Sequence, residues 1–260
     1  MGQMTLIRPR TLAISAAGFA TLAMACGPGS SMPLGPLDEL TSDAAVTVEG
    51  GQDARAKLDA GATKESGPPN PCPALTFQSG VKIQTFADAA MTATYAKHLG
   101  VGEVAPTCFL DVKNLVDPDT NSVYPITVDV ATHFTLEELV GTEVSQGFGK
   151  FVVIEPAAVA ALETFRNTVN IPVSVNSGFR SPAHQEAVCT SLCGDPLGCP
   201  GTCANNSRHM FGDAFDLPLE FYTQARAQAA CDSGFKFAYL ESGTHLHIDQ
   251  NPKFDMCVIQ

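Results

Sequence analysis

The sequence predicts an α+β fold in which a small antiparallel sheet is flanked by helices. Apolar residues recur at helical spacing between residues 155 and 170, and Pro156 stands in the first turn, where proline is tolerated. Nearer the C-terminus, residues 235–240 and 245–249 are rich in strand-forming side chains and surround a turn that contains Gly243. A long helix followed by such a strand pair is typical of a mixed fold.

Shorter patterns predict the other elements. Thr135 is followed three residues later by Glu138, which is the pattern of a capping box and predicts a helix start. Asp88 precedes a further helical stretch that ends before Gly100. The other expected elements are strands at 81–86, 123–130, 172–176 and 214–217, and helices at 183–188 and 221–230.

The start of the chain predicts export. Arg8 and Arg10 precede an apolar run that is too short to span a membrane comfortably, so residues 1–25 predict a signal peptide. The run is followed directly by Cys26, and a small residue before a cysteine resembles the bacterial lipobox, which predicts a lipid anchor at Cys26. The alternative is an ordinary cleaved signal followed by a chance cysteine.

Composition divides the rest of the chain into three parts. Residues 26–71 are rich in Gly, Pro, Ser, Ala and Asp, and we expect the lipidated Cys26 to be followed by a disordered linker because this stretch offers little apolar surface to bury. Residues 72–130 predict a small α+β N-terminal extension. Residues 131–260 carry the clearest patterns and predict the main domain.

Cysteine usage predicts disulfides. Eight cysteines lie between residue 72 and the C-terminus, and an even number in an exported chain favours oxidation. We expect one disulfide between Cys72 and Cys108 and two local disulfides within residues 189–203. A structural zinc site at the latter four cysteines is the alternative, although zinc pairs usually have two intervening residues, whereas these pairs have three.

The charge of the chain bears on its partners. The formal net charge is −12 at pH 7, and binding to nucleic acid depends largely on Lys and Arg side chains that neutralise phosphates. We therefore expect no nucleic-acid partner. The sequence also lacks a phosphate-binding glycine loop with its lysine.

Three motifs carry candidate functional side chains. They are Ser177-Gly178-Phe179-Arg180-Ser181, the segment from Ser207 to Asp216 that includes His209, and His245-Leu246-His247-Ile248-Asp249. Residues two apart on a strand share a face, so the imidazoles of the third motif are expected to point the same way. Two imidazoles and one carboxylate are the ligands of a catalytic zinc site with an open position, so the motifs predict a zinc hydrolase.

Taken together, the motifs resemble those of the zinc D-alanyl-D-alanine metallopeptidases, which include VanY-like carboxypeptidases and belong with lysostaphin- and hedgehog-type zinc peptidases. The family pattern is roughly S-G-(Y/F)-R-S, then S-x-H-x-x-G-x-A-x-D, then H-x-H followed by a hydrophobic residue and Asp. The resemblance covers residues 132–260. It implies a hedgehog-like or D-Ala-D-Ala-peptidase-like domain.

The resemblance implies a role for each matching residue. His209, Asp216 and His247 would bind zinc. Arg180 would hold the scissile carbonyl or a substrate carboxylate, and Ser207 would contact the substrate.

The general base is left open between two residues. Many relatives have an acidic residue three positions before the last zinc ligand, where this chain has Thr244. His245 lies beside the expected metal and is one candidate for the base or for a group that stabilises the oxyanion. Glu241 is the other candidate. Asp249 is expected to orient a ligand imidazole or to form a hydrogen bond within the core.

The expected function is hydrolysis of peptide bonds next to D-amino acids in peptidoglycan stem peptides, by a D-Ala-D-Ala carboxypeptidase or endopeptidase with Zn²⁺ as cofactor. The expected partners are the peptidoglycan peptide and, through Cys26, a bacterial membrane facing the periplasm or cell wall, and we expect a monomer. One alternative is a non-catalytic, zinc-containing lipoprotein that binds the cell wall or a partner. A zinc amidase or esterase acting on another wall bond is a further alternative.

Overall fold

The computed structural model describes residues 70–241 and 244–260, apart from the side chain of Glu241. The predicted signal peptide, the lipidation site at Cys26 and nearly all of the linker lie outside the described residues, as do the structures of residues 242 and 243. The described residues belong to one compact unit. Within this part of the chain, no helix is both long enough and apolar enough to cross a membrane.

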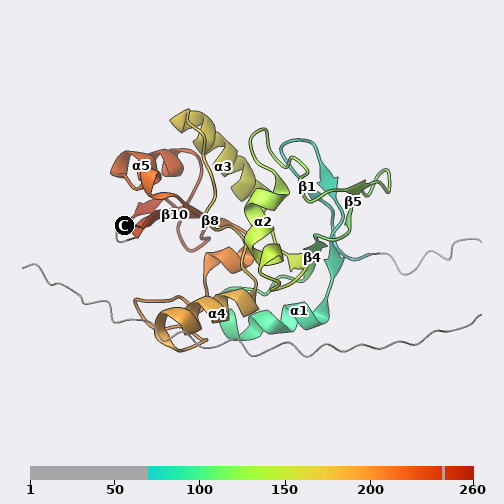
Figure 1. Cartoon of the computed structure of the whole chain (residues 1–260), viewed down its shortest axis with the longest axis horizontal. Coiled ribbons are helices and arrows are strands. Elements are labelled where there is room, and N and C mark those ends of the chain that lie inside the picture. Colours follow the sequence, from blue (N-terminus) through green and yellow to red (C-terminus); the bar gives the residue numbers. More distant parts are fainter. Residues whose placement is uncertain (1–69, 242–243) are drawn as a thin grey trace, which may run out of the picture. The chain divides into compact units, whose positions relative to one another are not determined.

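The described residues contain both helices and short strands, in agreement with the α+β prediction (Figure 1). The helices are α1 (Ala89–Thr94), α2 (Leu136–Ser145), α3 (Pro156–Val169), α4 (Pro182–Cys193) and α5 (Gln224–Asp232), with short 3-10 helices η1 (Tyr95–His98), η2 (Arg208–Phe211) and η3 (Leu219–Phe221). The strands are β1 (Leu75–Thr76), β2 (Lys82–Ile83), β3 (Phe86–Ala87), β4 (Cys108–Asp111), β5 (Leu115–Val116), β6 (Val123–Tyr124), β7 (Phe151–Val152), β8 (Ala214–Leu217), β9 (Phe237–Glu241), β10 (His245–Asp249) and β11 (Val258–Ile259).

The largest sheet lies in the C-terminal half and has the strand order β11-β9-β10-β8. Strand β10 pairs antiparallel with both β8 and β9, whereas the edge strand β11 pairs parallel with β9. The expected antiparallel sheet is therefore confirmed for β8, β9 and β10, whereas the edge strand β11 departs from it. Helices α3 and α5 pack against each other, and α5 also packs against β9 (Figure 1).

Each strand of this sheet has one face in the core. In β10, Leu246 and Ile248 are fully buried, and in β8 the side chains of Phe215 and Leu217 are buried as well. Because successive strand residues point to opposite faces, the residues between them lie on the other face. That second face carries the polar residues of the motifs.

The N-terminal extension consists of smaller sheets that join the same core. Strands β1 and β2 form one pair, β5 and β6 form another, and β3, β4 and β7 form a three-stranded sheet. Because β7 follows α2 in the chain, this last sheet contains strands from both sides of residue 131. Apolar residues of the extension such as Ile83 and Leu110 also share one core cluster with Leu136 and Phe165. The domain boundary at residue 131 stays a prediction.

Four disulfides connect the described cysteines. They are Cys72–Cys108, Cys189–Cys203, Cys193–Cys199 and Cys231–Cys257. The expected bond in the extension and the two local bonds of the loop are therefore confirmed. Residues 189–203 form a disulfide loop, in which the Cys193–Cys199 bond lies inside the segment closed by the Cys189–Cys203 bond.

Most expected helices are confirmed, and capping hydrogen bonds explain where several of them begin. Thr135 and Glu138 form the predicted capping box of α2, and Asp88 caps α1. The helix expected at 221–230 begins later, because Thr223 accepts a hydrogen bond from the backbone of Arg226 and caps α5. The helix expected at 183–188 extends over all of α4.

Three strand predictions differ from the structure. The stretch expected at 81–86 is divided between β2 and β3, and the strand expected at 123–130 is only the two residues of β6, since Pro125 follows directly. The strand expected at 172–176 is wrong. Pro172 has no N–H to donate to a ladder, and contact with β8 is limited to an isolated bridge in which Asn176 and Ser177 bond to the backbone of Asp216.

Candidate metal centre

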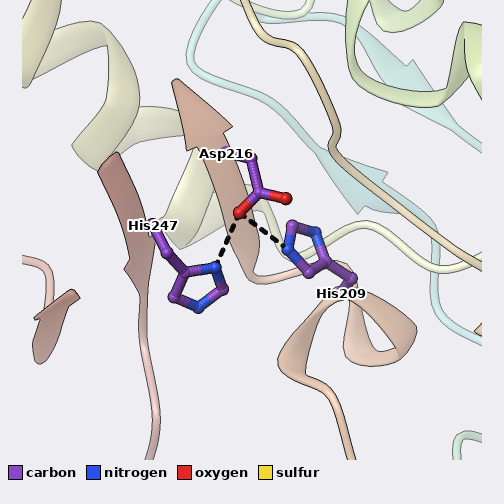
Figure 2. A group of neighbouring side chains, drawn as sticks. All are labelled: His209, Asp216 and His247. Carbon is purple, nitrogen blue, oxygen red and sulfur yellow. Dashed lines mark hydrogen bonds and ion pairs between the residues drawn. The ribbon is translucent and has the colours of Figure 1, made fainter. Parts of the chain in front are cut away.

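Asp216 and His247 are brought together by strand pairing. Asp216 lies on β8 and His247 on β10, and the two residues stand directly opposite each other in the antiparallel register. Both side chains lie on the face that points away from the core, as the alternation of each strand requires. The Nδ1 atom of His247 lies 2.8 Å from Oδ1 of Asp216 (Figure 2).

His209 reaches the same carboxylate from a turn. It lies in the 3-10 helix η2, and its Nε2 atom is 3.1 Å from Oδ1 of Asp216 (Figure 2). The imidazoles of His209 and His247 meet edge to face, with ring centroids 5.1 Å apart. One potential ligand atom from each of the three residues lies within 4.8 Å of the others. The three residues expected to bind metal therefore form one cluster.

The outer nitrogen of each imidazole contacts an oxygen. Nδ1 of His209 donates to the backbone carbonyl of Gly178 at 2.6 Å, and Nε2 of His247 lies 3.1 Å from a carboxylate oxygen of Asp249. Such contacts fix the orientation and tautomer of an imidazole and are typical of histidines that bind metal through the other nitrogen. The predicted orienting role of Asp249 thus has a matching contact.

Gly178 is required at its position because of a close backbone approach. Any side chain at this position would collide with the backbone carbonyl of Leu139 in α2. The next residue, Phe179, donates its N–H to that carbonyl at 2.9 Å. The first motif is thereby fixed on α2, and its carbonyl is aimed at His209.

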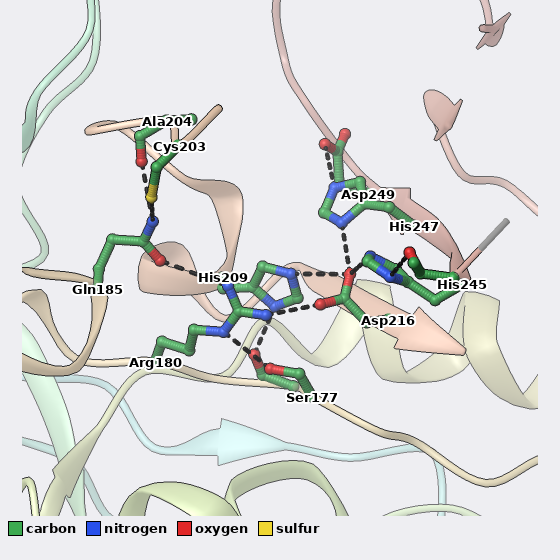
Figure 3. A network of polar contacts seen from close by, with 12 residues as sticks. Ser177, Arg180, Gln185, Cys203, Ala204, His209, Asp216, His245, His247 and Asp249 are labelled. Carbon is green, nitrogen blue, oxygen red and sulfur yellow. Dashed lines mark hydrogen bonds and ion pairs between the residues drawn. The ribbon is translucent and has the colours of Figure 1, made fainter. Parts of the chain in front are cut away.

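Arg180 lies at the centre of a polar network (Figure 3). Its Nη2 donates to Oδ2 of Asp216 at 2.6 Å, and its Nε donates to the hydroxyl of Ser177 at 2.8 Å. A weaker contact of 3.5 Å joins Nη1 to the side-chain oxygen of Gln185. Asp216 therefore presents one oxygen to the imidazoles, while Arg180 holds the other.

Gln185 connects this network to the disulfide loop. Its amide nitrogen donates to the carbonyl of Ala204 at 2.9 Å and lies 3.5 Å from the sulfur atoms of Cys189 and Cys203 (Figure 3). Gln185 was not among the site residues predicted from the sequence. Its position one turn into α4, just after Arg180 and the Ser181 cap, was a signal that could have identified it.

His245 lies beside the cluster on β10. Its Nε2 atom is 3.3 Å from Oδ1 of Asp216, and its Nδ1 atom is 2.9 Å from the hydroxyl of Thr244. About a fifth of its side chain is exposed. Glu241 pairs with His245 in the strand register, but its side chain is outside the described part of the structure.

Burial and charge shift the pKa values of the cluster. Burial acts to raise the pKa of Asp216, but the facing imidazoles, above all His209, hold it well below its usual range. Burial lowers the pKa of His209. Burial also acts to lower the pKa of His247, but hydrogen bonds to Asp216 and Asp249 raise it to about 9. Asp216 is therefore an anion, as a metal ligand must be.

The cluster opens into a cleft of about 850 Å³. The sheet contributes aromatic and imidazole side chains to it, and the disulfide loop forms another wall. Ser207, which was expected to contact substrate, lines this cleft together with Arg180 and His245. Glu103 of the N-terminal extension also lines the cleft.

Comparison with known families supports the same chemistry. Residues 132–249 match the family model described as peptidase M15. These residues form a domain of the peptidase M15 family. No curated protein matches the chain.

The M15 domain contains every residue that the sequence motifs predicted for the site. The family implies a peptidase and supports the resemblance to zinc D-Ala-D-Ala peptidases. His209, Asp216 and His247 lie together in a cluster that can hold a metal ion, with Arg180 and His245 in contact with it. The hedgehog-like arrangement of the fold and the individual catalytic roles stay predictions.

Proposed function

We propose that the M15 domain is a zinc peptidase that hydrolyses peptide bonds next to D-amino acids in peptidoglycan stem peptides, as a D-Ala-D-Ala carboxypeptidase or endopeptidase. The observation that carries this proposal is the convergence of His209, Asp216 and His247 on one point of an open cleft. Membership of the M15 family gives the reaction class.

The donor set suits zinc. Catalytic zinc sites usually have three protein ligands drawn from His and Asp or Glu and keep a further position open. The three residues here supply two nitrogen atoms and one oxygen atom, and Asp216 adds one negative charge. The oxygen contacts of Gly178 and Asp249 leave the inner nitrogen of each imidazole facing the shared point.

In the proposed reaction, a water oxygen bonds to the carbonyl carbon of the substrate, the C–N bond breaks, and a proton passes to the leaving nitrogen. A zinc ion bound by the three ligands would supply Lewis acidity and make water a stronger nucleophile at neutral pH. Arg180 is proposed to stabilise the negative charge on the carbonyl oxygen. A guanidinium has five N–H groups, and the three contacts described for Arg180 use only part of this capacity.

We propose His245 as the group that moves the proton. Its Nε2 atom faces the same carboxylate oxygen as the ligand imidazoles, and the side chain is partly open to the cleft. Thr244 holds the opposite ring nitrogen and orients the ring. Glu241 is the alternative base, because it stands opposite His245 in the ladder. Ser207, in the cleft wall, is proposed to contact the substrate.

We also propose that the protein is an exported lipoprotein, anchored at Cys26 to a bacterial membrane and facing the periplasm or cell wall. The four disulfides support this location, because such bonds persist in oxidising compartments. A linker between Cys26 and the folded part would allow the domain to reach the wall. The proposed partner is the peptidoglycan peptide, and the proposed state is a monomer.

The proposal is tested by digestion of defined muropeptides. The purified protein is incubated with a stem peptide ending in D-Ala-D-Ala and with cross-linked muropeptides, and the products are identified by mass spectrometry. We expect cleavage that a chelator abolishes and added zinc restores. His209→Ala should be inactive, whereas His133→Ala, which changes a half-exposed histidine bonded to Glu163 of α3, should stay active. Full activity of His209→Ala would rule out the proposed chemistry.

One observation favours a second candidate function. Thr244 occupies the position where many relatives have the acidic base, so a zinc-containing domain that binds the wall or a partner without catalysis is the alternative. Stoichiometric zinc and tight muropeptide binding with no product after long incubation would favour this alternative. Product formation by the wild-type protein would exclude it.

A further inference from the structure

The segment from Asn205 to Phe211 contains the metal-ligand candidate His209 but belongs to no sheet. Its backbone forms only a short 3-10 helix, η2. Such a turn has few hydrogen bonds of its own. Contacts from elsewhere must therefore hold His209 in place, and within the described residues many of them come from the N-terminal extension.

Tyr95 of the extension contacts the residue after His209. Its hydroxyl donates to the backbone carbonyl of Met210 at 2.9 Å, and the whole side chain is buried. Its ring packs against Phe109 and Phe211, with centroids 6.2 and 6.0 Å away. Burial raises the pKa of the Tyr95 hydroxyl, so it stays a donor. The hydrogen bond fixes the turn immediately after the ligand.

His98 fixes the start of the same segment. Its ring is fully buried, and its Nδ1 atom lies 2.6 Å from the side-chain oxygen of Asn205. Its Nε2 atom lies 3.1 Å from Glu186 of α4. The amide of Asn205 donates in turn to the carbonyl of Lys97 at 2.8 Å. Figure 1 shows the α1 segment running beside α4, as these contacts require. His98 therefore joins three segments at one point.

A third contact involves the residue before His209. Arg208 forms an ion pair with Asp213 and lies 3.6 Å from the carboxylate of Glu103 in the extension. Glu103 also accepts the backbone N–H of Gly100 at 2.5 Å. The extension thus contacts residues on both sides of His209.

We propose that Tyr95 and His98 are positioning residues for the metal ligand His209, so that the N-terminal extension is part of the metal-binding unit rather than an appended module. The hydroxyl of Tyr95 and the ring of His98 hold the two ends of a turn that has no strand partner. The inference rests on the proposed function only in taking zinc as the metal.

The test is the zinc affinity of Tyr95→Phe, measured by competition with a chromophoric chelator on the metal-free full-length protein. Removing one net hydrogen bond should weaken zinc binding about 2- to 10-fold. The matched control is Tyr124→Phe, which removes a hydroxyl of the same extension that donates to Asp117 at 2.7 Å, in the β5–β6 hairpin. The control should leave zinc affinity unchanged.

His98→Gln is a second test variant, because it changes the other proposed positioning residue. Thermal unfolding of the metal-free proteins is measured in parallel, and zinc affinity should fall for Tyr95→Phe and His98→Gln but not for Tyr124→Phe. Equal zinc affinity of Tyr95→Phe and wild type would overturn the inference, as would an equal loss in the Tyr124→Phe control. The zinc-binding assay uses no substrate, so its result does not depend on catalysis. Wild-type protein that binds zinc but cleaves no muropeptide would contradict the proposed function without contradicting this inference.

Discussion

The candidate metal centre is built from two regions that are held in different ways. Asp216 and His247 stand opposite each other in neighbouring strands, so backbone pairing alone brings them together. His209 lies in a turn whose position depends on contacts with Gly178, Tyr95 and His98. The strand half of the site is thus determined by the register and the alternation of two paired strands. The turn half is determined by residues distant in the sequence.

Substitution of Asp216 in the strand half should have the largest effect on zinc binding and activity. Asp216→Asn removes the anion that His209, His247 and Arg180 all contact. We expect zinc affinity and peptidase activity to fall by more than about 100-fold, beyond the range typical for loss of an outer contact. Zinc stoichiometry and the rate of muropeptide cleavage measure this. If Asp216→Asn still bound stoichiometric zinc, the proposal that the Asp216 carboxylate is a zinc ligand would be contradicted.

A smaller loss of zinc affinity is expected from a change at Asp249, which contacts a ligand candidate rather than the metal. Asp249→Asn replaces the carboxylate beside His247 and should weaken zinc binding about 10- to 100-fold. Asp111→Asn is a matched control, because both aspartates are buried at a strand end and accept the N–H two residues on. The control should lose stability but bind zinc normally. An equal loss of zinc affinity in both variants would mean that the Asp249 contact is merely structural.

The same contrast explains what the sequence could predict. Alternation in 245–249 and the short strand at 214–217 place His247, Asp216 and the flanking core residues correctly, since strand faces follow from residue order. The helix caps at Asp88 and Thr135 are equally local. Recognition of His209 as a ligand depended on its motif and on the family resemblance, because no local pattern determines where a turn lies in space.

What the sequence could not predict depends on long-range contacts. Tyr95 and His98 act on residues more than a hundred positions away. The strand prediction at 172–176 was wrong because Pro172 removes a donor and only an isolated bridge at Asn176 and Ser177 reaches β8. Sequence spacing carries no information about such pairings.

The smallest effect is expected when the disulfide loop beside the turn half is changed. Replacing Cys189 and Cys203 with Ala removes the bond next to Gln185, which contacts Arg180. We expect a stability loss of about 3 kcal/mol for this loop length and a reduction in kcat/KM of about 2- to 10-fold from the disturbed Gln185 contact.

The inner bond, Cys193–Cys199, lies within the loop closed by Cys189–Cys203 and is the matched control for that experiment. Its removal should cost about 2 kcal/mol, because the closed loop is shorter, and should leave kcat/KM near the wild-type value. Urea unfolding and steady-state kinetics measure both quantities. If removal of the Cys193–Cys199 bond lowered kcat/KM as much as removal of the Cys189–Cys203 bond, Gln185 would not be the link between the loop and Arg180.

The central claim is that His209, Asp216 and His247 bind one zinc ion. X-ray absorption spectroscopy of the zinc-loaded, fully oxidised protein tests it most directly. The account predicts a shell of nitrogen and oxygen atoms at about 2.0–2.2 Å, two of them from imidazoles, and loss of bound zinc in His209→Ala. A sulfur shell at about 2.3 Å, or an unchanged spectrum in that variant, would contradict it.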